Sequence, residues 1–255
     1  MPTRYGRFAL AGLVLLGGCQ GMPGRGVKEH ASSALLDSGP QPRVTKRESA
    51  DIHVALGRSM EEQGRPEEAR DPYLQALKAD PKRADAEVRL AILDDLRGDQ
   101  TGADRHFDRA LTLKPKDPEI LCDRGYSFYL RRRWPDAEAS LKRALAVDPA
   151  HPRSHTNLGL VLARRGEGPA ALAEFARAGC DPADARSNLA LVMALEGRLE
   201  ESRKEYALAL STKPASSRAK EGLRATGLVL VGHPEARSPE VGGQADPAVA
   251  RTSIP

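Results

Sequence analysis

Apolar residues between positions 50 and 216 recur at the three- and four-residue spacing of helices, and the whole pattern repeats every 34 residues. Each unit contains two alanines around a large apolar residue, followed in most units by proline: Ala69, Tyr73, Ala76 and Pro81; Ala103, Phe107, Ala110 and Pro115; Ala137, Leu141, Ala144 and Pro149; Ala171, Phe175 and Ala178; with Tyr206, Ala209 and Pro214 in the last. The spacing predicts five stacked helix pairs, in units of residues 50–83, 84–117, 118–151, 152–182 and 183–216.

Glycine marks the turn between the two helices in four of the five units, at Gly64, Gly98, Gly166 and Gly197. Glycine tolerates the positive φ that often follows a helix C-terminus. Arg132 stands at this place in the third unit, so we expect a slightly strained left-handed turn there. The fourth unit is three residues short, which predicts that its second helix ends early, near Gly179. Residues 215–226 predict a final helix whose polar side caps the stack.

A small residue stands at the eighth position of the first four units, as Gly57, Ala91, Gly125 and Gly159. With the alanines, the large residue and the proline, it completes a pattern that resembles the tetratricopeptide repeat (TPR) family. The resemblance implies an all-α, right-handed solenoid of about five helix pairs plus a C-terminal capping helix, over residues 48–226. Small residues would let the helices approach closely, and the large residue would fill the space between units.

The resemblance also implies a concave surface lined by five positions of each first helix. In units two to five these positions carry many large side chains, and we expect the following to form a partner-binding groove: Val88, Ile92, Leu96, Tyr126, Tyr129, Leu130, Leu160, Arg164 and Leu191. An apolar strip of this kind suits an extended peptide or an amphipathic helix, with Tyr126 and Tyr129 as anchors. Family members that grip a C-terminal carboxylate use Lys and Asn where this chain has Val54 and Arg58, so that clamp is not expected. Arg153, Asn157 and Arg164 are instead candidates for a weaker anion site in the fourth unit.

The N-terminal segment reads as an export signal. Arg4 and Arg7 precede an apolar run at residues 8–16, which is too short to span a bilayer. Leu16-Gly17-Gly18-Cys19 resembles the lipobox of bacterial lipoproteins, which implies removal of residues 1–18 and a lipid anchor on Cys19. An ordinary secretory signal with an incidental cysteine is the alternative. Gln20 at the next position favours the outer membrane, by resemblance to known sorting rules.

Two further segments lack a helical period. Residues 19–47 are rich in Gly, Pro and Ser, which predicts a flexible tether between the anchor and the repeats. Residues 227–255 predict a disordered tail, in which the apolar run at residues 228–231 would pack on the last helix or serve as a docking strand.

Candidate chemistry is sparse, and we expect no cofactor, no metal and no catalytic residue. His151 and His155 lie four residues apart, but no third ligand accompanies them, and exposed helix residues explain them better. Cys122 and Cys180 have no partnering motif, which is typical of idle thiols. The formal net charge of +4 gives no support to nucleic-acid binding.

These features predict a membrane-anchored lipoprotein of the bacterial envelope that acts as an adaptor or assembly factor, facing the periplasm. The layout is similar to the TPR lipoproteins of pilus and secretion systems, such as pilotins and the Tad-type pilus assembly lipoprotein. An envelope adaptor for cell-wall enzymes is a second hypothesis, and a metal-dependent hydrolase using His151 and His155 is a remote third. The partner and the oligomeric state stay open.

Overall fold

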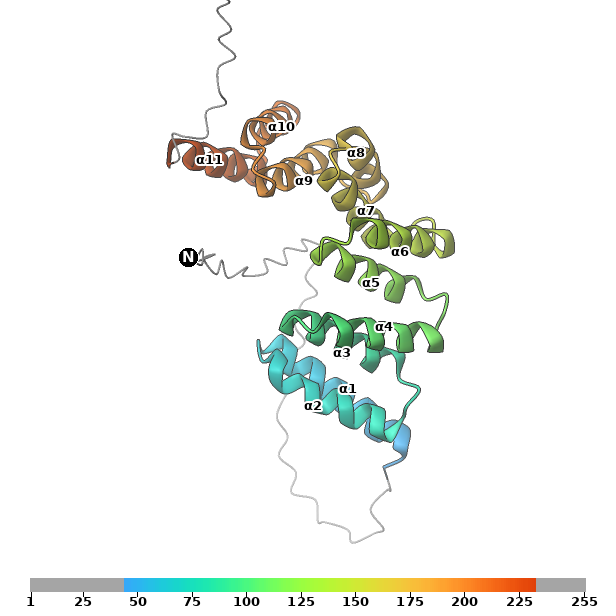
Figure 1. The fold of residues 1–255 in the computed structure, drawn as a ribbon. Coiled ribbons are helices and arrows are strands. Elements are labelled where there is room, and N and C mark those ends of the chain that lie inside the picture. Colours follow the sequence, from blue (N-terminus) through green and yellow to red (C-terminus); the bar gives the residue numbers. More distant parts are fainter. Residues whose placement is uncertain (1–43, 233–255) are drawn as a thin grey trace, which may run out of the picture. The chain divides into compact units, whose positions relative to one another are not determined.

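The computed structural model describes residues 44–232, with side chains described as far as residue 227. This part of the chain is helical throughout and contains no strand (Figure 1). Its helices are α1 (Lys46–Glu62), α2 (Pro66–Ala79), α3 (Ala84–Arg97), α4 (Gln100–Leu113), α5 (Pro118–Leu130), α6 (Trp134–Val147), α7 (Pro152–Arg164), α8 (Gly168–Arg177), α9 (Pro182–Leu195), α10 (Leu199–Thr212) and α11 (Ser217–Gly232). The predicted signal segment, Cys19, most of the predicted tether and the tail beyond residue 232 lie outside the described residues.

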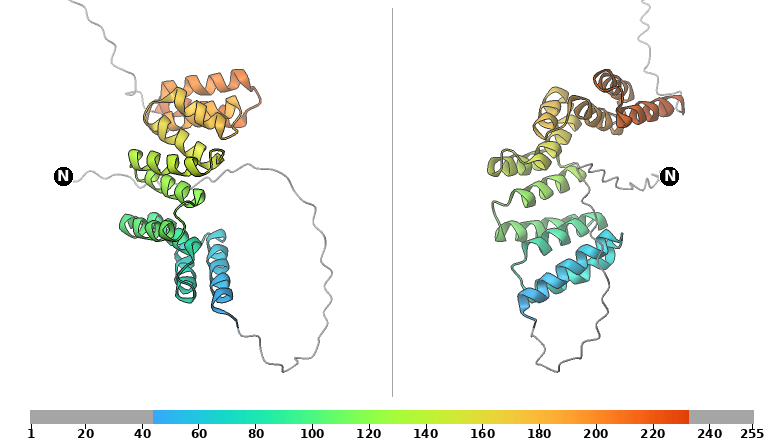
Figure 2. Two further views of the ribbon diagram at one scale, coloured as in Figure 1. Left: turned by 90° about the vertical axis from the view of Figure 1, so that its right-hand side faces the viewer. Right: turned by 180° about the vertical axis from the view of Figure 1, so that it is seen from behind.

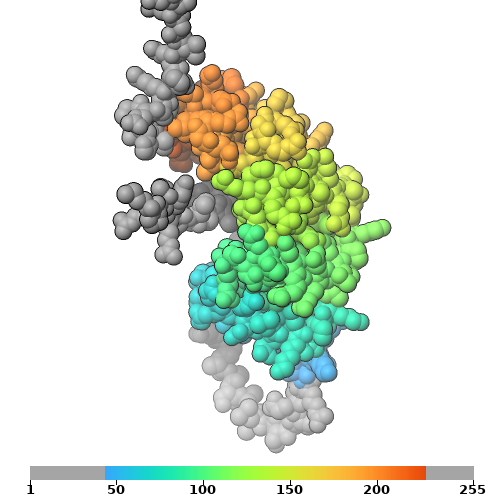
Figure 3. All heavy atoms as spheres, in the orientation of Figure 1, coloured from blue at the N-terminus to red at the C-terminus, as the bar shows by residue number. Residues whose placement is uncertain are grey.

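The helices pair along the chain, as α1 with α2, α3 with α4 and so on to α9 with α10, and each pair packs on the next. Figure 2 shows these pairs following one another in the order of the sequence, with α11 against the last pair. Figure 3 draws all atoms as spheres and shows that consecutive pairs touch, so the repeats form one continuous packed body. The predicted TPR solenoid of five helix pairs and a capping helix is confirmed.

The helical repeat region extends further than predicted at both of its ends. Helix α1 begins at Lys46 because Thr45 and Glu48 form a capping box, in which the Thr45 hydroxyl accepts from the Glu48 N–H at 3.2 Å and the Glu48 carboxylate accepts from the Thr45 N–H at 2.8 Å. Helix α11 continues to Gly232, so the predicted boundary at residue 226 is wrong. The apolar run at residues 228–231 is part of this helix and is not a strand, since no proline interrupts α11 before Gly232.

The turns within the pairs have the predicted geometry. Gly64, Gly98, Gly166 and Gly197 have φ between +74° and +82°, and Arg132 takes the same left-handed conformation with φ +59°. Helix α8 is only 10 residues long and is followed by Gly179 at φ +87°, as the shortened fourth unit predicts.

The core of each pair is a close contact between the large residue of the second helix and a small residue of the first. Tyr73, Phe107, Leu141 and Phe175 are fully buried. A Cβ atom placed on Gly125 would lie 2.6 Å from Leu141, and one on Gly159 would lie 2.6 Å from Phe175. The glycines are therefore required by packing, because any larger side chain would force the helices apart.

Three of the five pairs also carry a polar bridge between equivalent positions 19 residues apart. The His106 Nδ1 lies 2.5 Å from Glu87, the His155 Nδ1 lies 2.7 Å from Glu174, and Arg186 donates to Glu205 at 2.7 Å. The histidine pairs are buried. In α3 and α4 the glutamate lies on the first helix and the histidine on the second, whereas in α7 and α8 this order is reversed. These bridges join the first helix of a pair to the second one helical turn before the small residue of the first helix, as with His155 and Gly159.

Candidate partner-binding groove

The first helices of the pairs form the inner side of the stack. From α3 onward each first helix contacts the next one, at α3 with α5, α5 with α7, α7 with α9 and α9 with α11. No comparable contact joins successive second helices within residues 44–232. The stack therefore curves around its first helices, and a partner that follows this curve meets their exposed positions.

Large apolar side chains are exposed along this inner side. We call them the inner strip, and it consists of Leu96, Tyr126, Leu130, Leu191 and Leu195. Leu96 is 68% exposed, which is the largest value among them, and Tyr126 at 41% is the smallest. The residues lie on α3, α5 and α9, and on α5 and α9 they stand one helical turn apart. Scattered apolar residues are ordinary on a protein surface, but a row that recurs at the same two repeat positions, the ninth and the thirteenth, indicates a contact surface.

Other predicted groove residues are less accessible. Val88 is 7% exposed, while Ile92 and Leu160 are half-buried at the base of the inner side. Tyr129 is only 8% exposed, so its predicted role as an anchor is wrong. Its ring stacks beneath Tyr126 with centroids 5.9 Å apart, and its hydroxyl accepts from Arg164 at 3.1 Å. Tyr129 thus supports Tyr126, and Tyr126 is the one of these two tyrosines that presents its ring to the inner side.

The predicted anion site at Arg164 is also occupied by the chain itself. The guanidinium forms an ion pair with Glu196 and lies over the Tyr129 ring, 5.7 Å from its centroid. Arg153, nearby on α7, pairs with both Glu119 and Asp123. Since each of these cations already faces a carboxylate, an anionic ligand would have to displace an internal partner.

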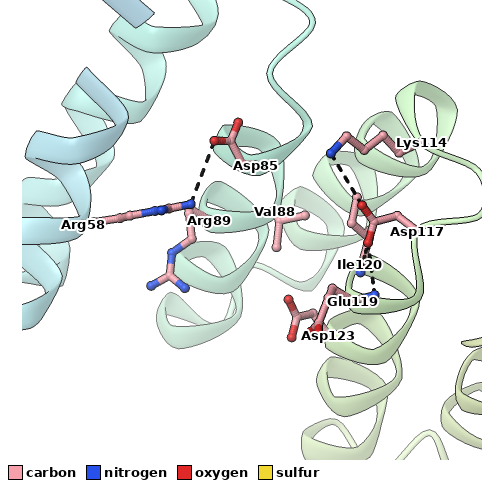
Figure 4. A pocket seen from close by; sticks show the side chains of 9 residues that line it. All are labelled: Arg58, Asp85, Val88, Arg89, Lys114, Asp117, Glu119, Ile120 and Asp123. Carbon is pink, nitrogen blue, oxygen red and sulfur yellow. Dashed lines mark hydrogen bonds and ion pairs between the residues drawn. The ribbon is translucent and has the colours of Figure 1, made fainter. Parts of the chain in front are cut away.

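A polar hollow of about 280 Å³ lies beside the inner strip, between α1, α3 and α5 (Figure 4). Arg58 and Arg89 enter it from one side, and Glu119, Ile120 and Asp123 from α5 on the other. Arg58 is 4.0 Å from its nearest carboxylate, on Asp85. The hollow therefore places guanidinium groups opposite carboxylates across an open space, which suits polar groups of a peptide better than an apolar side chain.

Burial shifts the pKa values of charged groups in this hollow. It raises the pKa of Asp123, although Arg153 opposes that effect, and it lowers the pKa of Arg89. A hydrogen bond from His151 holds the pKa of Glu119 below its usual value. Arg89 and Asp123 both stand at the sixth position of a first helix, which the family's groove positions do not include, so neither residue was predicted. The sequence feature that could have identified Arg89 and Asp123 is that they carry opposite charges at the same repeat position.

The two histidines of the hydrolase hypothesis are structural. Both are buried, so the expectation of exposed helix residues is wrong. His151 caps α7, since its Nδ1 accepts from the Ser154 N–H at 3.2 Å, and its Nε2 lies 2.9 Å from Glu119. His155 is held between Glu174 and the carbonyl of Pro149, at 2.7 and 2.9 Å. They contact different partners and do not converge on one point.

The two thiols have the surroundings of unreactive cysteines. Cys122 is fully buried, and burial raises the pKa of both Cys122 and Cys180, which disfavours the reactive thiolate. Within residues 44–227 no three His, Cys, Asp or Glu side chains are grouped so as to hold a metal ion. No described helix is long and apolar enough to cross a membrane.

Comparison with known proteins agrees with this architecture. Family models described as tetratricopeptide repeat match residues 50–93, 122–185 and 183–204. The chain is similar to the type IV pilus assembly protein PilF of Pseudomonas aeruginosa, with 30% identity over 116 residues. This match covers 45% of the chain and 46% of the relative, so it spans about half of that protein's length.

Solved structures show the same fold. The structure from the functional characterization of Pseudomonas aeruginosa pilF superposes with a TM-score of 0.55 at 23% identity, covering 72% of this chain and 91% of that one. The crystal structure of PilW, described as a widely conserved type IV pilus biogenesis factor, gives a TM-score of 0.56 at 22% identity and covers 75% and 96%. With the matched repeats, the stacked pairs and the exposed inner side, the chain belongs to the tetratricopeptide repeat proteins, scaffolds that bind protein or peptide partners.

Proposed function

We propose that this protein is an envelope adaptor that binds an apolar segment of a protein partner on its inner strip during assembly of a type IV pilus. The inner strip is the observation that carries the proposal, because five large apolar side chains face the side where TPR proteins bind peptides. The names of PilF and PilW support the pilus system as the setting.

The contacts around the inner strip favour a partner with apolar anchors and polar flanks. Tyr126 rests on Tyr129, which packs in turn on Trp134 at 5.5 Å between ring centroids. A ring held in this way loses little conformational freedom when a partner covers it, so it is a good anchor. The charged hollow at α1, α3 and α5 lies beyond this anchor and would take the polar end of the bound segment.

The membrane link of the proposal rests on Cys19. A lipidated Cys19 would hold the repeats at the membrane, where a pilus component would meet them. Replacing Cys19 by Ser should move the protein from the membrane fraction to the soluble periplasmic fraction. Persistence of the variant in the membrane fraction would show that another contact retains it, and would remove the lipid anchor from the proposal.

Affinity capture from cell envelopes tests the groove. Tyr126→Ala with Leu130→Ala removes two side chains of the inner strip that are 41% and 56% exposed, so the fold should persist. Leu74→Ala with Leu208→Ala is the matched control, since these residues are 41% and 45% exposed on the second helices α2 and α10. Circular dichroism of both double variants checks folding before the capture.

The expected result is that wild type and control recover pilus components and the inner-strip variant loses them at least tenfold. Equal recovery by all three would exclude the inner strip as the binding surface. Recovery of cell-wall enzymes in place of pilus components would favour the second adaptor hypothesis, with the same groove serving a different system.

A further inference from the structure

The first helix of the stack has an uncovered apolar side. In units two to five, the third, seventh and tenth positions of the first helix pack beneath the preceding pair; the third position is Ala86, Ile120, Ser154 and Ala185, each at most 5% exposed. Leu90, Leu158 and Leu189 at the seventh position of units two, four and five are equally buried, and the third unit has the partly buried Arg124 there. In the first unit the same positions are Ile52 and Leu56, which are 57% and 45% exposed. Helix α1 lies at one end of the described stack, and only α2 packs closely against it (Figure 2).

This side of α1 has a regular composition. Ile52, Ala55, Leu56 and Ser59 follow the i, i+3, i+4, i+7 spacing of a single helix face, which we call the α1 stripe. None of the four is charged. The opposite end of the stack differs, since Lys220, Glu221 and Arg224 are exposed on α11. A repeat stack needs a polar outer face at both ends to stay alone in water. Among the described residues, the α1 stripe interrupts that face at the N-terminal end, where the exposed Glu48 lies one turn before Ile52.

We propose that the α1 stripe is the contact surface for a second copy of this chain, which pairs α1 with α1 about a twofold axis. The C-terminal end is charged, so head-to-tail stacking would set ions against Ile52 and Leu56. A twofold contact sets the stripe against itself. With the helices antiparallel and the axis near residues 55 and 56, Ile52 falls opposite Ser59 of the second copy, so a large side chain meets a small one. Ala55 and Leu56 lie beside the axis, each near its own counterpart.

The composition of the stripe also limits the strength of the pairing. One helix on each side buries far less than the roughly 1,600 Å² of a standard stable interface. Asp51, Arg58 and Glu62 flank the stripe on one edge, and Asp51 is paired with Arg83, so the edge that the twofold axis brings together carries both signs of charge. The dimer should therefore form only at raised local concentration.

Disulfide trapping in the full chain tests the pairing. Ala55→Cys places a thiol beside the proposed axis, and Leu208→Cys on the second helix α10 is the control at a residue of similar exposure to Leu56. Both variants keep the native cysteines. We expect mild oxidation of envelope membranes to give a species of twice the chain mass from Ala55→Cys alone, and we expect reduction to remove it. Adding Leu56→Glu should reduce this species at least tenfold, with circular dichroism showing an intact fold.

Other outcomes would overturn the proposal and identify what covers the stripe. Equal trapping of both variants would mean random collision. An adduct of a different mass would mean another protein occupies the stripe. If Ala55→Cys gives no dimer and its introduced thiol resists alkylation, residues of the same chain cover the stripe. If it gives no dimer and that thiol is freely alkylated, the stripe is bare. Each of these results concerns α1 and leaves the inner strip and its partner untouched.

Discussion

At the residue scale, glycine at the eighth position sets how closely the helices of a pair approach. Gly57, Gly125 and Gly159 each face a buried ring or leucine at a distance that leaves no room for a methyl group. Glycine normally weakens a helix by about 1 kcal/mol relative to alanine, so its use here means that packing outweighs helix propensity. The same residue type serves a different purpose at the turns, where backbone conformation requires it.

Gly159→Ala should lower the free energy of unfolding by about 1–3 kcal/mol, because the new Cβ would lie 2.6 Å from a Phe175 ring that is fully buried. Urea denaturation followed by circular dichroism measures the change. Gly168→Ala is the control, since its Cβ would meet only Leu189, at 3.6 Å. A destabilisation of equal size in the two variants would contradict the packing argument.

Arg132 is the residue for which the turn geometry is least suitable. It holds a φ of +59°, which costs an ordinary side chain about 1 kcal/mol, and it makes no ion pair among the described residues. Arg132→Gly should therefore raise the unfolding free energy by roughly 0.5–1 kcal/mol, with Arg132→Asn in between. If thermal or urea unfolding shows no gain for glycine, the strain argument fails at this turn.

At the element scale, the buried polar bridges join the two helices of a pair at a specific rotation. A hydrophobic contact permits small rotations, whereas a hydrogen bond between α7 and α8 requires the two donor and acceptor atoms to meet. The third pair joins its two helices at the equivalent positions without charged side chains. It carries Leu121 and Ser140 at the equivalent positions, and the Ser140 hydroxyl donates to the Leu121 carbonyl at 2.9 Å.

Glu174→Ser should cost about 2–3 kcal/mol of unfolding free energy, since it leaves the buried His155 without its acidic partner. Adding His155→Leu copies the residues of the third pair and should recover part of this loss. A double-mutant cycle measured by urea denaturation gives the coupling energy. Strictly additive losses would show that the two side chains do not act as a pair.

At the scale of the whole molecule, ion pairs cross the joints between repeats. Arg83 bridges Asp51 of the first pair and Asp85 of the second, Arg153 of the fourth pair binds Glu119 and Asp123 of the third, and Lys213 pairs with Asp181 at 2.7 Å. Exposed pairs contribute little individually, but they link residues some 30 positions apart, so they help to orient successive repeats.

Asp85 accepts hydrogen bonds from Arg83 on both of its oxygens and gives this joint a pH dependence. Arg83 donates to its two oxygens at 2.9 and 2.7 Å and holds the pKa of Asp85 below its ordinary value of 3.8. A lowered folded pKa means that the stabilisation is complete above about pH 4–5 and is lost as the pH falls through the folded pKa.

Asp85→Asn should thus lower the unfolding free energy by about 1 kcal/mol at pH 7, after allowance for solvent screening, and the difference from wild type should shrink below about pH 4. Urea denaturation at pH 7, 5 and 3 measures it. Asp71→Asn, on the exposed side of α2, should show no such trend. A difference that stays constant down to pH 3 would contradict the assigned cause.

The architecture could be predicted from the sequence because every determinant of it is local or periodic. At fixed spacing, Ala allows two helices to approach, a large residue fills the space between them, and Pro marks the end of the second helix. Gly179 indicates the early end of the second helix in the fourth pair. The ends of the repeat region were less accurately predicted. They depend on a capping box at Thr45 and on how far α11 continues, which a repeat period does not encode.

The sequence by itself determined the fold, the turn positions and which helix faces point inward, since these follow from residue size and spacing along one chain. Only the tertiary structure decided which inward residues are accessible. Tyr126 and Tyr129 are three positions apart, yet one is exposed and the other buried, because the rotation of α5 against Trp134 and α7 covers Tyr129. The charge partners of Arg164, His151 and His155 likewise come from neighbouring helices, and a single helix cannot reveal what its neighbour contributes.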